Sequence, residues 1–226
     1  MFFIRNKGEK LKKVLKLDDF INILKIANTE IEKNKEYLSN LDSVIGDGDH
    51  GITISTAFSK INNEISSKSF SSIPELLKFI GNLFITSIGG TTGPIFGYIF
   101  IGMSTTLNDT ATKEVSLSEF YHMLSDALQK VISIGKANPG DKTLVDTLNA
   151  AVNSLKDSVD KNMEMPEGIK AMADEARKGA ESTKNMVATK GRARYLGERS
   201  IGYQDAGATS VSIILNAFDI YLQNNK

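Results

Sequence analysis

Apolar residues recur every three or four positions along most of this chain, which is the spacing that one buried face of an α-helix requires. The clearest series comprises Val145, Leu148, Val152, Leu155 and Val159. This periodicity predicts an all-α protein of eight helices. The predicted helices cover residues 18–39, 50–66, 94–107, 141–160, 166–187 and 205–222, together with stretches that begin at residues 72 and 116.

Two of the predicted helices begin with a capping box, in which a hydroxyl and a carboxylate bond the first free N–H groups. Ser72 is followed by Glu75, and Ser116 is followed by Glu119. Residues 98–101 and 210–215 are rich enough in β-branched and aromatic side chains to form strands. Because each lies inside a longer stretch that starts with a helix signal, we predict helix for both.

Composition limits the classes of protein to which the chain can belong. Its 226 residues are 41% hydrophobic and no long linker divides them, so one domain with one core is expected. The balance of 27 basic and 27 acidic residues gives no support to binding of nucleic acid or an anionic membrane. No apolar run spans a bilayer, and the absence of cysteine excludes disulfides and thiol catalysis, so the cytoplasm is the expected compartment.

The first 17 residues differ from the rest of the chain. They carry a cluster of positive charges at Arg5, Lys7, Lys10, Lys12 and Lys13. We predict a basic, solvated arm at residues 1–17 and a single domain at residues 18–226.

Four unusual loops fall in every second gap between the predicted helices, at residues 46–51, 89–94, 138–142 and 190–192. If the helices run alternately up and down, these loops share one end of the bundle. A carboxylate cluster, glycine-rich backbone and a basic segment would meet there. That combination suits a ligand made of metal and phosphate.

The first loop holds the carboxylates. Asp42, Asp47 and Asp49 carry all the formal charge between residues 41 and 59. The glycines between them permit a tight turn, and hard oxygen ligands around one point select Mg²⁺ or Ca²⁺. The alternative is a solvated turn in which Asp49 caps the next helix. His50, alone at a helix start, is more typical of a structural hydrogen bond than of catalysis.

The other three loops are less specific. Thr91 and Thr92 lie in a glycine-rich turn at a helix start, where free N–H groups attract anions, although a tight helix connection is the alternative. Asp141 is a candidate N-cap, and Lys142 is expected to be exposed. The last loop has a net excess of three positive charges, from Lys190, Arg192, Arg194 and Arg199 against Glu198. Arg192 is the preferred phosphate or partner contact.

Together these segments resemble the nucleotide-binding L subunit of dihydroxyacetone kinase. The resemblance rests on residues 41–51, 89–94, 140–146 and 190–200 and covers nearly everything after residue 17. It implies an eight-helix antiparallel barrel with ADP (or ATP) and two Mg²⁺ ions at one end, and Asp42, Asp47 and Asp49 as metal ligands. The residues that match the family's nucleotide site are His50, Gly51, Ile52, Thr53, Thr91, Thr92, Gly135, Leu144, Arg192, Asp205, Ala206 and Gly207.

The sequence departs from the family pattern at a few positions of this site. Thr53 stands where asparagine is usual, and Thr91 with Thr92 stands where alanine and serine are common. Tyr203 replaces a common histidine, and Ala206 replaces a common proline. None of these changes removes a metal carboxylate. They leave open whether the acceptor is dihydroxyacetone or another short ketose or polyol.

The resemblance implies phosphoryl transfer to a hydroxyl group on a separate K-like subunit that holds the acceptor, so no catalytic residue is assigned on this chain. The nucleotide is either exchanged as ATP or retained as ADP and rephosphorylated by an M-like protein of the phosphotransferase system. A stand-alone chain of this length favours the second mode. Neither nucleic acid nor a membrane is an expected partner.

Two other functions stay open. The chain could be a nucleotide-loaded regulatory or scaffold protein that binds a transcription factor or a kinase subunit without turnover. It could also be the nucleotide module of a fatty-acid kinase. The latter is disfavoured because that family's loop typically has threonine where this chain has His50.

Overall fold

The computed structural model describes residues 12–107 and 109–225, so Arg5, Lys7 and Lys10 of the predicted arm lie outside the described residues. Nine α-helices form within that part of the chain: α1 (Leu17–Lys33), α2 (Lys35–Ile45), α3 (His50–Ser67), α4 (Ile73–Ser87), α5 (Thr92–Thr105), α6 (Leu117–Gly135), α7 (Leu144–Asp160), α8 (Met165–Ser182) and α9 (Ala206–Asn224). The remaining described elements are the strands β1 (Val14–Lys16) and β2 (Glu114–Ser116) and the 3₁₀ segments η1 (Thr183–Asn185) and η2 (Arg192–Ser200).

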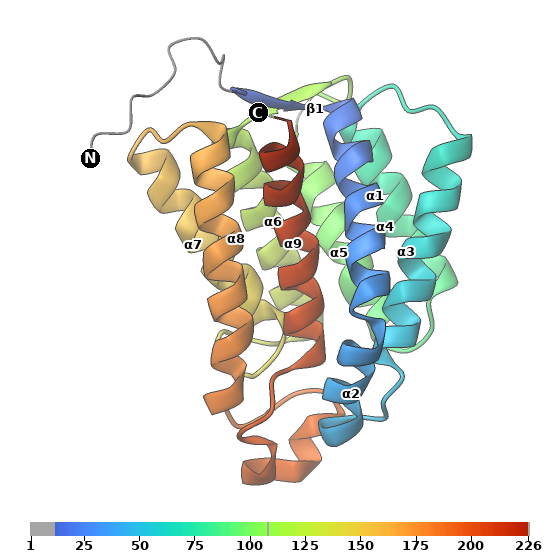
Figure 1. Ribbon diagram of the computed structural model, residues 1–226, viewed down its shortest axis with the longest axis vertical. Coiled ribbons are helices and arrows are strands. Elements are labelled where there is room, and N and C mark those ends of the chain that lie inside the picture. Colours follow the sequence, from blue (N-terminus) through green and yellow to red (C-terminus); the bar gives the residue numbers. More distant parts are fainter. Residues whose placement is uncertain (1–11, 108, 226) are drawn as a thin grey trace.

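Eight of these nine helices close a ring in which each packs against the next. Helices α3 to α9 follow one another in chain order, and α1 fills the gap between α9 and α3. Neighbouring helices run in opposite directions around the ring (Figure 1). The predicted eight-helix antiparallel barrel is therefore confirmed, and residues 98–101 and 210–215 are helical as predicted. In the described part of the chain, no helix is both long and apolar enough to cross a membrane.

The additional helix, α2, arises because the predicted helix over residues 18–39 breaks at Asn34. The Asn34 side-chain amide donates a hydrogen bond to the carbonyl of Glu30 (2.8 Å), and the Asn34 backbone has φ −100° and ψ 7°. A side-chain bond of this kind competes with the regular helix ladder. The chain turns at this point, and α2 lies below the end of α1 in Figure 1.

Phenylalanine rings fill much of the barrel. Phe20, Phe120 and Phe218 pack against one another at ring-centroid distances between 4.9 and 6.3 Å, and Phe84 stacks on Phe100 at 5.7 Å. All five side chains are buried. Large rings with many contacts contribute strongly to core stability. The packed barrel thus forms a frame on which the loops at its ends are held.

The end of the barrel opposite α2 is closed by a two-stranded sheet (Figure 1). Strand β1 pairs antiparallel with β2, with Leu15 opposite Val115, and both side chains are fully buried. Lys12 forms an ion pair with Asp19, which also accepts a hydrogen bond from Tyr221 of α9. The prediction of a solvated arm is therefore wrong around Leu15. A strand of three residues is too short to show an alternating pattern in the sequence.

Candidate functional site

Four helices begin at the end of the barrel near α2. Because neighbouring helices alternate in direction, α3, α5, α7 and α9 all have their N-termini there. The first turn of a helix has free N–H groups and the positive end of the helix dipole, and both attract anions. The sequence-predicted loops are the segments that lead into these four helices.

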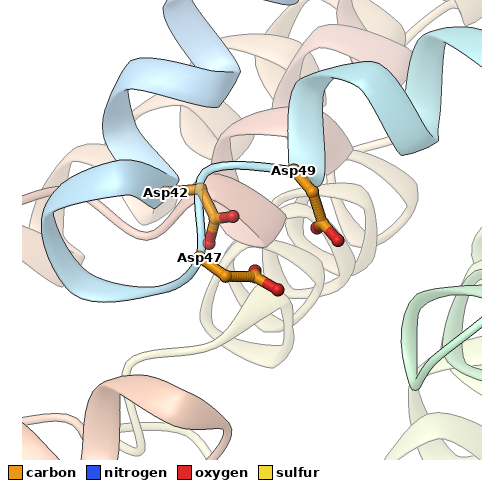
Figure 2. Close-up of side chains that lie close together, drawn as sticks. All are labelled: Asp42, Asp47 and Asp49. Carbon is orange, nitrogen blue, oxygen red and sulfur yellow. The ribbon is translucent and has the colours of Figure 1, made fainter.

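Three aspartates gather beside the start of α3, and Figure 2 shows their carboxylates close together. Asp42 comes from the last turn of α2, Asp47 from the connecting loop, and Asp49 immediately precedes α3. One carboxylate oxygen from each lies within 4.8 Å of the others. Three hard oxygen donors converging on one point are a donor set that fits Mg²⁺ or Ca²⁺. The predicted cluster therefore forms.

The backbone between α2 and α3 fixes this arrangement. The N–H of Gly46 donates to the carbonyl of Asp42 at 2.5 Å, and a β-carbon on Gly46 would collide with the Asp42 carboxylate. Gly48 has φ +78°, a left-handed conformation that favours glycine. The N–H of His50 donates to the Asp42 carboxylate at 3.2 Å and orients it. Both glycines are thus required by geometry.

Asp49 stands at the N-cap position of α3, but its side chain makes no capping hydrogen bond. The alternative in which this aspartate serves as a helix cap is therefore wrong. Its carboxylate is exposed and faces Asp42 and Asp47 (Figure 2). Because the Asp49 carboxylate accepts no capping hydrogen bond, both of its oxygens are available to bind a cation.

The ring of His50 points into the protein. Its Nε2 atom lies 2.8 Å from the hydroxyl of Ser210 on α9, and the ring packs near Phe96. Burial lowers the pKa of His50, while the charges of Asp42 and Asp49 oppose that shift. The ring is therefore neutral near pH 7 and structural, as its position at a helix start indicated. The part of His50 that faces the loop is its backbone.

The other residues of the first turn of α3 differ in exposure. Gly51 is buried, and a β-carbon there would collide with the carbonyl of Lys35 in α2, so this glycine lets α3 begin against α2. Ile52 is exposed and Thr53 is partly exposed. Thr53 N–H bonds the carbonyl of Asp49 at 2.9 Å, which closes the first turn.

The glycine-rich loop before α5 lies open. A β-carbon on Gly89 or Gly90 would meet nothing within 4 Å, and Gly90 has φ +67°. Thr91 is exposed at the N-cap position without a capping bond, and Thr92 opens the helix. The loop therefore lies at a helix start, as predicted, and its role in binding an anion stays a prediction. Gly135, at the end of α6, lies beside Ile95 of α5, so the end of α6 borders the start of α5.

The starts of α7 and α9 lie next to each other. Leu144 opens α7, and a β-carbon on Gly207 of α9 would lie 3.9 Å from the Leu144 side chain. Ala206 is buried in the first turn of α9. Asp205 caps α9 by accepting the N–H of Ala208 at 2.7 Å. Desolvation raises the pKa of Asp205 to about 6, although the Ala208 bond and Lys142 oppose the shift.

The loop before α7 corrects two sequence predictions. Thr143, not Asp141, is the N-cap of α7, and it forms a capping box with Asp146. Asp141 instead accepts hydrogen bonds from the N–H of Asn138 (2.7 Å) and from Thr189. Lys142, expected to be exposed, is only 2% exposed. No sequence pattern distinguishes a buried lysine in such a polar loop from a solvated one.

The basic loop reaches the carboxylate cluster. Arg192, the first residue of η2, forms an ion pair with Asp47, and η2 lies against α2. The alternating helix directions predict that this fourth loop lies beside the carboxylates, and the ion pair confirms it. Arg194 turns instead onto Tyr195, whose ring it covers at 4.7 Å and whose hydroxyl it contacts at 2.6 Å. Of the loop's basic residues, Arg192 thus faces the carboxylates directly.

Comparisons with known proteins show the family to which this chain belongs. The DAK2 domain family matches residues 44–219. The chain is 40% identical over 195 residues to the Escherichia coli (strain K12) PEP-dependent dihydroxyacetone kinase, ADP-binding subunit DhaL, covering 86% of this chain and 92% of that protein. It is 36% identical over 198 residues to the Lactococcus lactis (subsp. lactis, strain IL1403) PTS-dependent dihydroxyacetone kinase, ADP-binding subunit DhaL, covering 87% and 93% respectively.

Among solved structures, the dihydroxyacetone kinase of C. freundii superposes with a TM-score of 0.72 at 21% identity. The likeness covers 97% of this chain but 38% of that longer chain, and at this identity it shows the shared fold alone. The family match and the two relatives, each aligned over most of its length, show the family itself. This chain belongs to the DAK2 domain family and, within it, to the group of DhaL ADP-binding subunits.

Proposed function

We propose that this chain is the ADP-binding subunit of a dihydroxyacetone kinase that receives its phosphate from phosphoenolpyruvate. The observation that carries the proposal is the triad of Asp42, Asp47 and Asp49, with one oxygen of each within 4.8 Å of the others, at the end where four helices begin. Such an end attracts both divalent cations and phosphates. The names of the E. coli and L. lactis relatives support the same function.

The three aspartates would hold two Mg²⁺ ions, which when bound offset charge on the transferring phosphoryl group. Around them, the free N–H groups of helix first turns orient the phosphates, and Arg192 supplies a positive charge at the mouth of the site. We propose that the nucleotide is lined by His50, Gly51, Ile52, Thr53, Thr91, Thr92, Gly135, Leu144, Arg192, Asp205, Ala206 and Gly207.

We infer that the acceptor arrives on a partner protein that docks at this end. Within the described residues, every exposed large apolar side chain belongs to segments around the site: Tyr37, Val44, Ile52, Ile134, Val187, Tyr195, Ile201 and Tyr203. Apolar side chains gathered around a polar opening are typical of a protein interface. A K-like subunit carrying dihydroxyacetone fits this surface, and another short ketose or polyol is the alternative acceptor.

The relatives' names and the position of Arg192 support phosphoenolpyruvate as the phosphate source. Arg192 of η2 pairs with Asp47, so η2 would lie against a nucleotide held at the carboxylates. We infer that ADP stays bound and is rephosphorylated in place by an M-like protein of the phosphotransferase system. A subunit that exchanges free ATP is the alternative.

The proposal is tested by reconstituting the transfer. The chain is mixed with a K-like partner that holds dihydroxyacetone, and with either labelled phosphoenolpyruvate plus phosphotransferase proteins or labelled ATP. We expect label in dihydroxyacetone phosphate with phosphoenolpyruvate, and a loss of at least about a hundredfold in Asp49→Ala, since a ligand of the transferring phosphate's metals is removed. Asp126→Ala, which removes an exposed carboxylate of α6, is the matched control.

The two donors distinguish retained ADP from exchanged ATP, and the transfer itself distinguishes a kinase from a regulatory protein. Transfer with ATP alone would replace the retained-ADP mode by nucleotide exchange. Absence of transfer from either donor, in a protein that still binds the partner, would favour a regulatory role over a kinase.

A further inference from the structure

Lys142 is a charged side chain in an unusual place. It is 2% exposed, and its backbone adopts a left-handed conformation with φ +59°. Its ammonium group donates hydrogen bonds to the backbone carbonyls of Thr183 and Tyr203. Burying an ammonium group is costly unless its N–H groups are bonded, and here carbonyl oxygens meet that need. Burial lowers the pKa of Lys142, and the nearby charges of Asp205 and Asp146 oppose that shift by favouring the charged form.

The two carbonyls stand at the two ends of one segment. Residues 184–202, here called the lid segment, leave the barrel after Thr183 and return at Tyr203. The segment carries η2, which lies beside α2 at the lower end of the molecule in Figure 1. Its base is closed by a bond from the N–H of Gly202 to the carbonyl of Lys184 at 2.7 Å. Lys142 thus bonds both stems of the lid segment at once.

The lid segment has almost no core of its own. Only Ala188 and Ser200 within it are buried, and these two bond each other through the Ala188 N–H and the Ser200 hydroxyl at 2.9 Å. Thr189 bonds Asp141, the neighbour of Lys142. With so few buried residues of its own, the segment takes its position from outside contacts: its stems, the loop that contains Lys142, and the contact of η2 and Arg192 with α2 and Asp47.

We propose that Lys142 is a positioning residue for the nucleotide site, which holds both stems of the lid segment and thereby sets Arg192 opposite Asp47. The nucleotide part of this inference rests on the proposed function, since Arg192 is proposed to contact the bound phosphates. The anchoring part does not depend on it. Lys142 acts through the backbone at Thr183 and Tyr203 and has no role in the chemistry itself.

Trypsin tests the anchoring part, because the lid segment offers cleavage sites after Lys184, Lys190, Arg192, Arg194 and Arg199. In ligand-free protein, held at the same interval below each variant's melting temperature, Lys142→Met should be cut in the lid segment at least about tenfold faster than wild type. Thr147→Val is the matched control: Thr147 is also fully buried and also bonds a backbone carbonyl, that of Ala208 in α9. The control should be cut in the lid at the wild-type rate.

Release of ADP tests the part that concerns the site. Lys142→Met should release ADP at least about tenfold faster than wild type, and the effect should largely disappear in an Arg192→Ala background, since residues that act through one another are not additive. Lys142→Arg, which keeps a bonded cation, should restore slow release. If the methionine variant does not fold, Lys142→Gln takes its place in both measurements.

Different results would overturn the anchoring role of Lys142 and the proposed function. Equal lid cleavage in Lys142→Met and Thr147→Val would overturn the inference, as would an ADP release effect that is undiminished by Arg192→Ala. If wild type retains no ADP, the proposed function fails, and the trypsin comparison still decides whether Lys142 anchors the lid segment.

Discussion

Two aspartates at helix N-termini of the site use their carboxylates in different ways. Asp205 accepts the N–H of Ala208 and so caps α9, whereas Asp49 makes no such bond at the start of α3. Both positions look alike in the sequence, as an aspartate before an apolar helix start. The difference is set by neighbours: Asp49 faces two further carboxylates, and Asp205 lies where desolvation raises its pKa to about 6.

The raised pKa of Asp205 predicts a pH dependence of stability. Its ordinary pKa is 3.8, so between pH 4 and about 6 the folded state binds more protons than the unfolded state, and the free energy of unfolding falls as pH rises. The full shift corresponds to at most about 3 kcal/mol. Asp205→Asn, which keeps a capping oxygen, should remove this fall. Urea unfolding of ligand-free protein in chelator from pH 4 to 7 measures it.

Asp126→Asn is the control for that experiment, because it removes an exposed carboxylate from α6. Its unfolding free energy should follow the wild-type pH profile. A difference between wild type and Asp205→Asn that stays constant from pH 4 to 7 would show that Asp205 is not desolvated in the folded protein.

The sequence predicts capping boxes at the starts of α4 and α6, and the structure forms the complete box only at α6. At α6 the Ser116 hydroxyl accepts the N–H of Glu119, and the Glu119 carboxylate accepts the N–H of Ser116 at 2.7 Å, so the predicted capping box forms. At α4 the Ser72 hydroxyl accepts the N–H of Glu75, but the Glu75 carboxylate bonds Ser71 instead. A helix can thus keep its boundary while its second capping bond moves by one residue.

The box at α6 gives a prediction for an element. Ser116→Ala should lower the free energy of unfolding by about 1 kcal/mol, since the first turn loses the acceptor for one of its N–H groups. Ser118→Ala, at an exposed position two residues into the same helix, should change stability by less than about 0.5 kcal/mol. Guanidinium unfolding of both variants makes the comparison. Equal losses would mean that the hydroxyl of Ser116 does not act as a cap.

Across the barrel, the alternating direction of the helices decides which loops meet. It placed Arg192 opposite Asp47 although the two are far apart in the chain, because loops in every second gap must share one end. Helix existence and the carboxylate cluster followed from periodicity and from local spacing. These features are encoded in short stretches, so a single sequence suffices to predict them.

Features that depend on tertiary contacts were not predictable. The burial of Lys142 requires two distant carbonyls, the strand at Leu15 requires its partner at Val115, and the break at Asn34 depends on one side-chain bond. None of these three contacts produces a periodic pattern in the surrounding sequence. The lid segment is also positioned by tertiary contacts, so its anchoring could not be predicted from the sequence.

We propose that the aspartates near the start of α3 hold a nucleotide through divalent cations. Mass spectrometry of the denatured protein, purified in Mg²⁺, tests it most directly, with melting temperature recorded alongside. We predict that wild type and Asp126→Ala release ADP, whereas Asp47→Ala releases none and melts at a lower temperature, because a ligand bound only to the folded state stabilises it. Equal ADP content and equal melting temperature in Asp47→Ala and wild type would show that Asp47 does not hold the nucleotide.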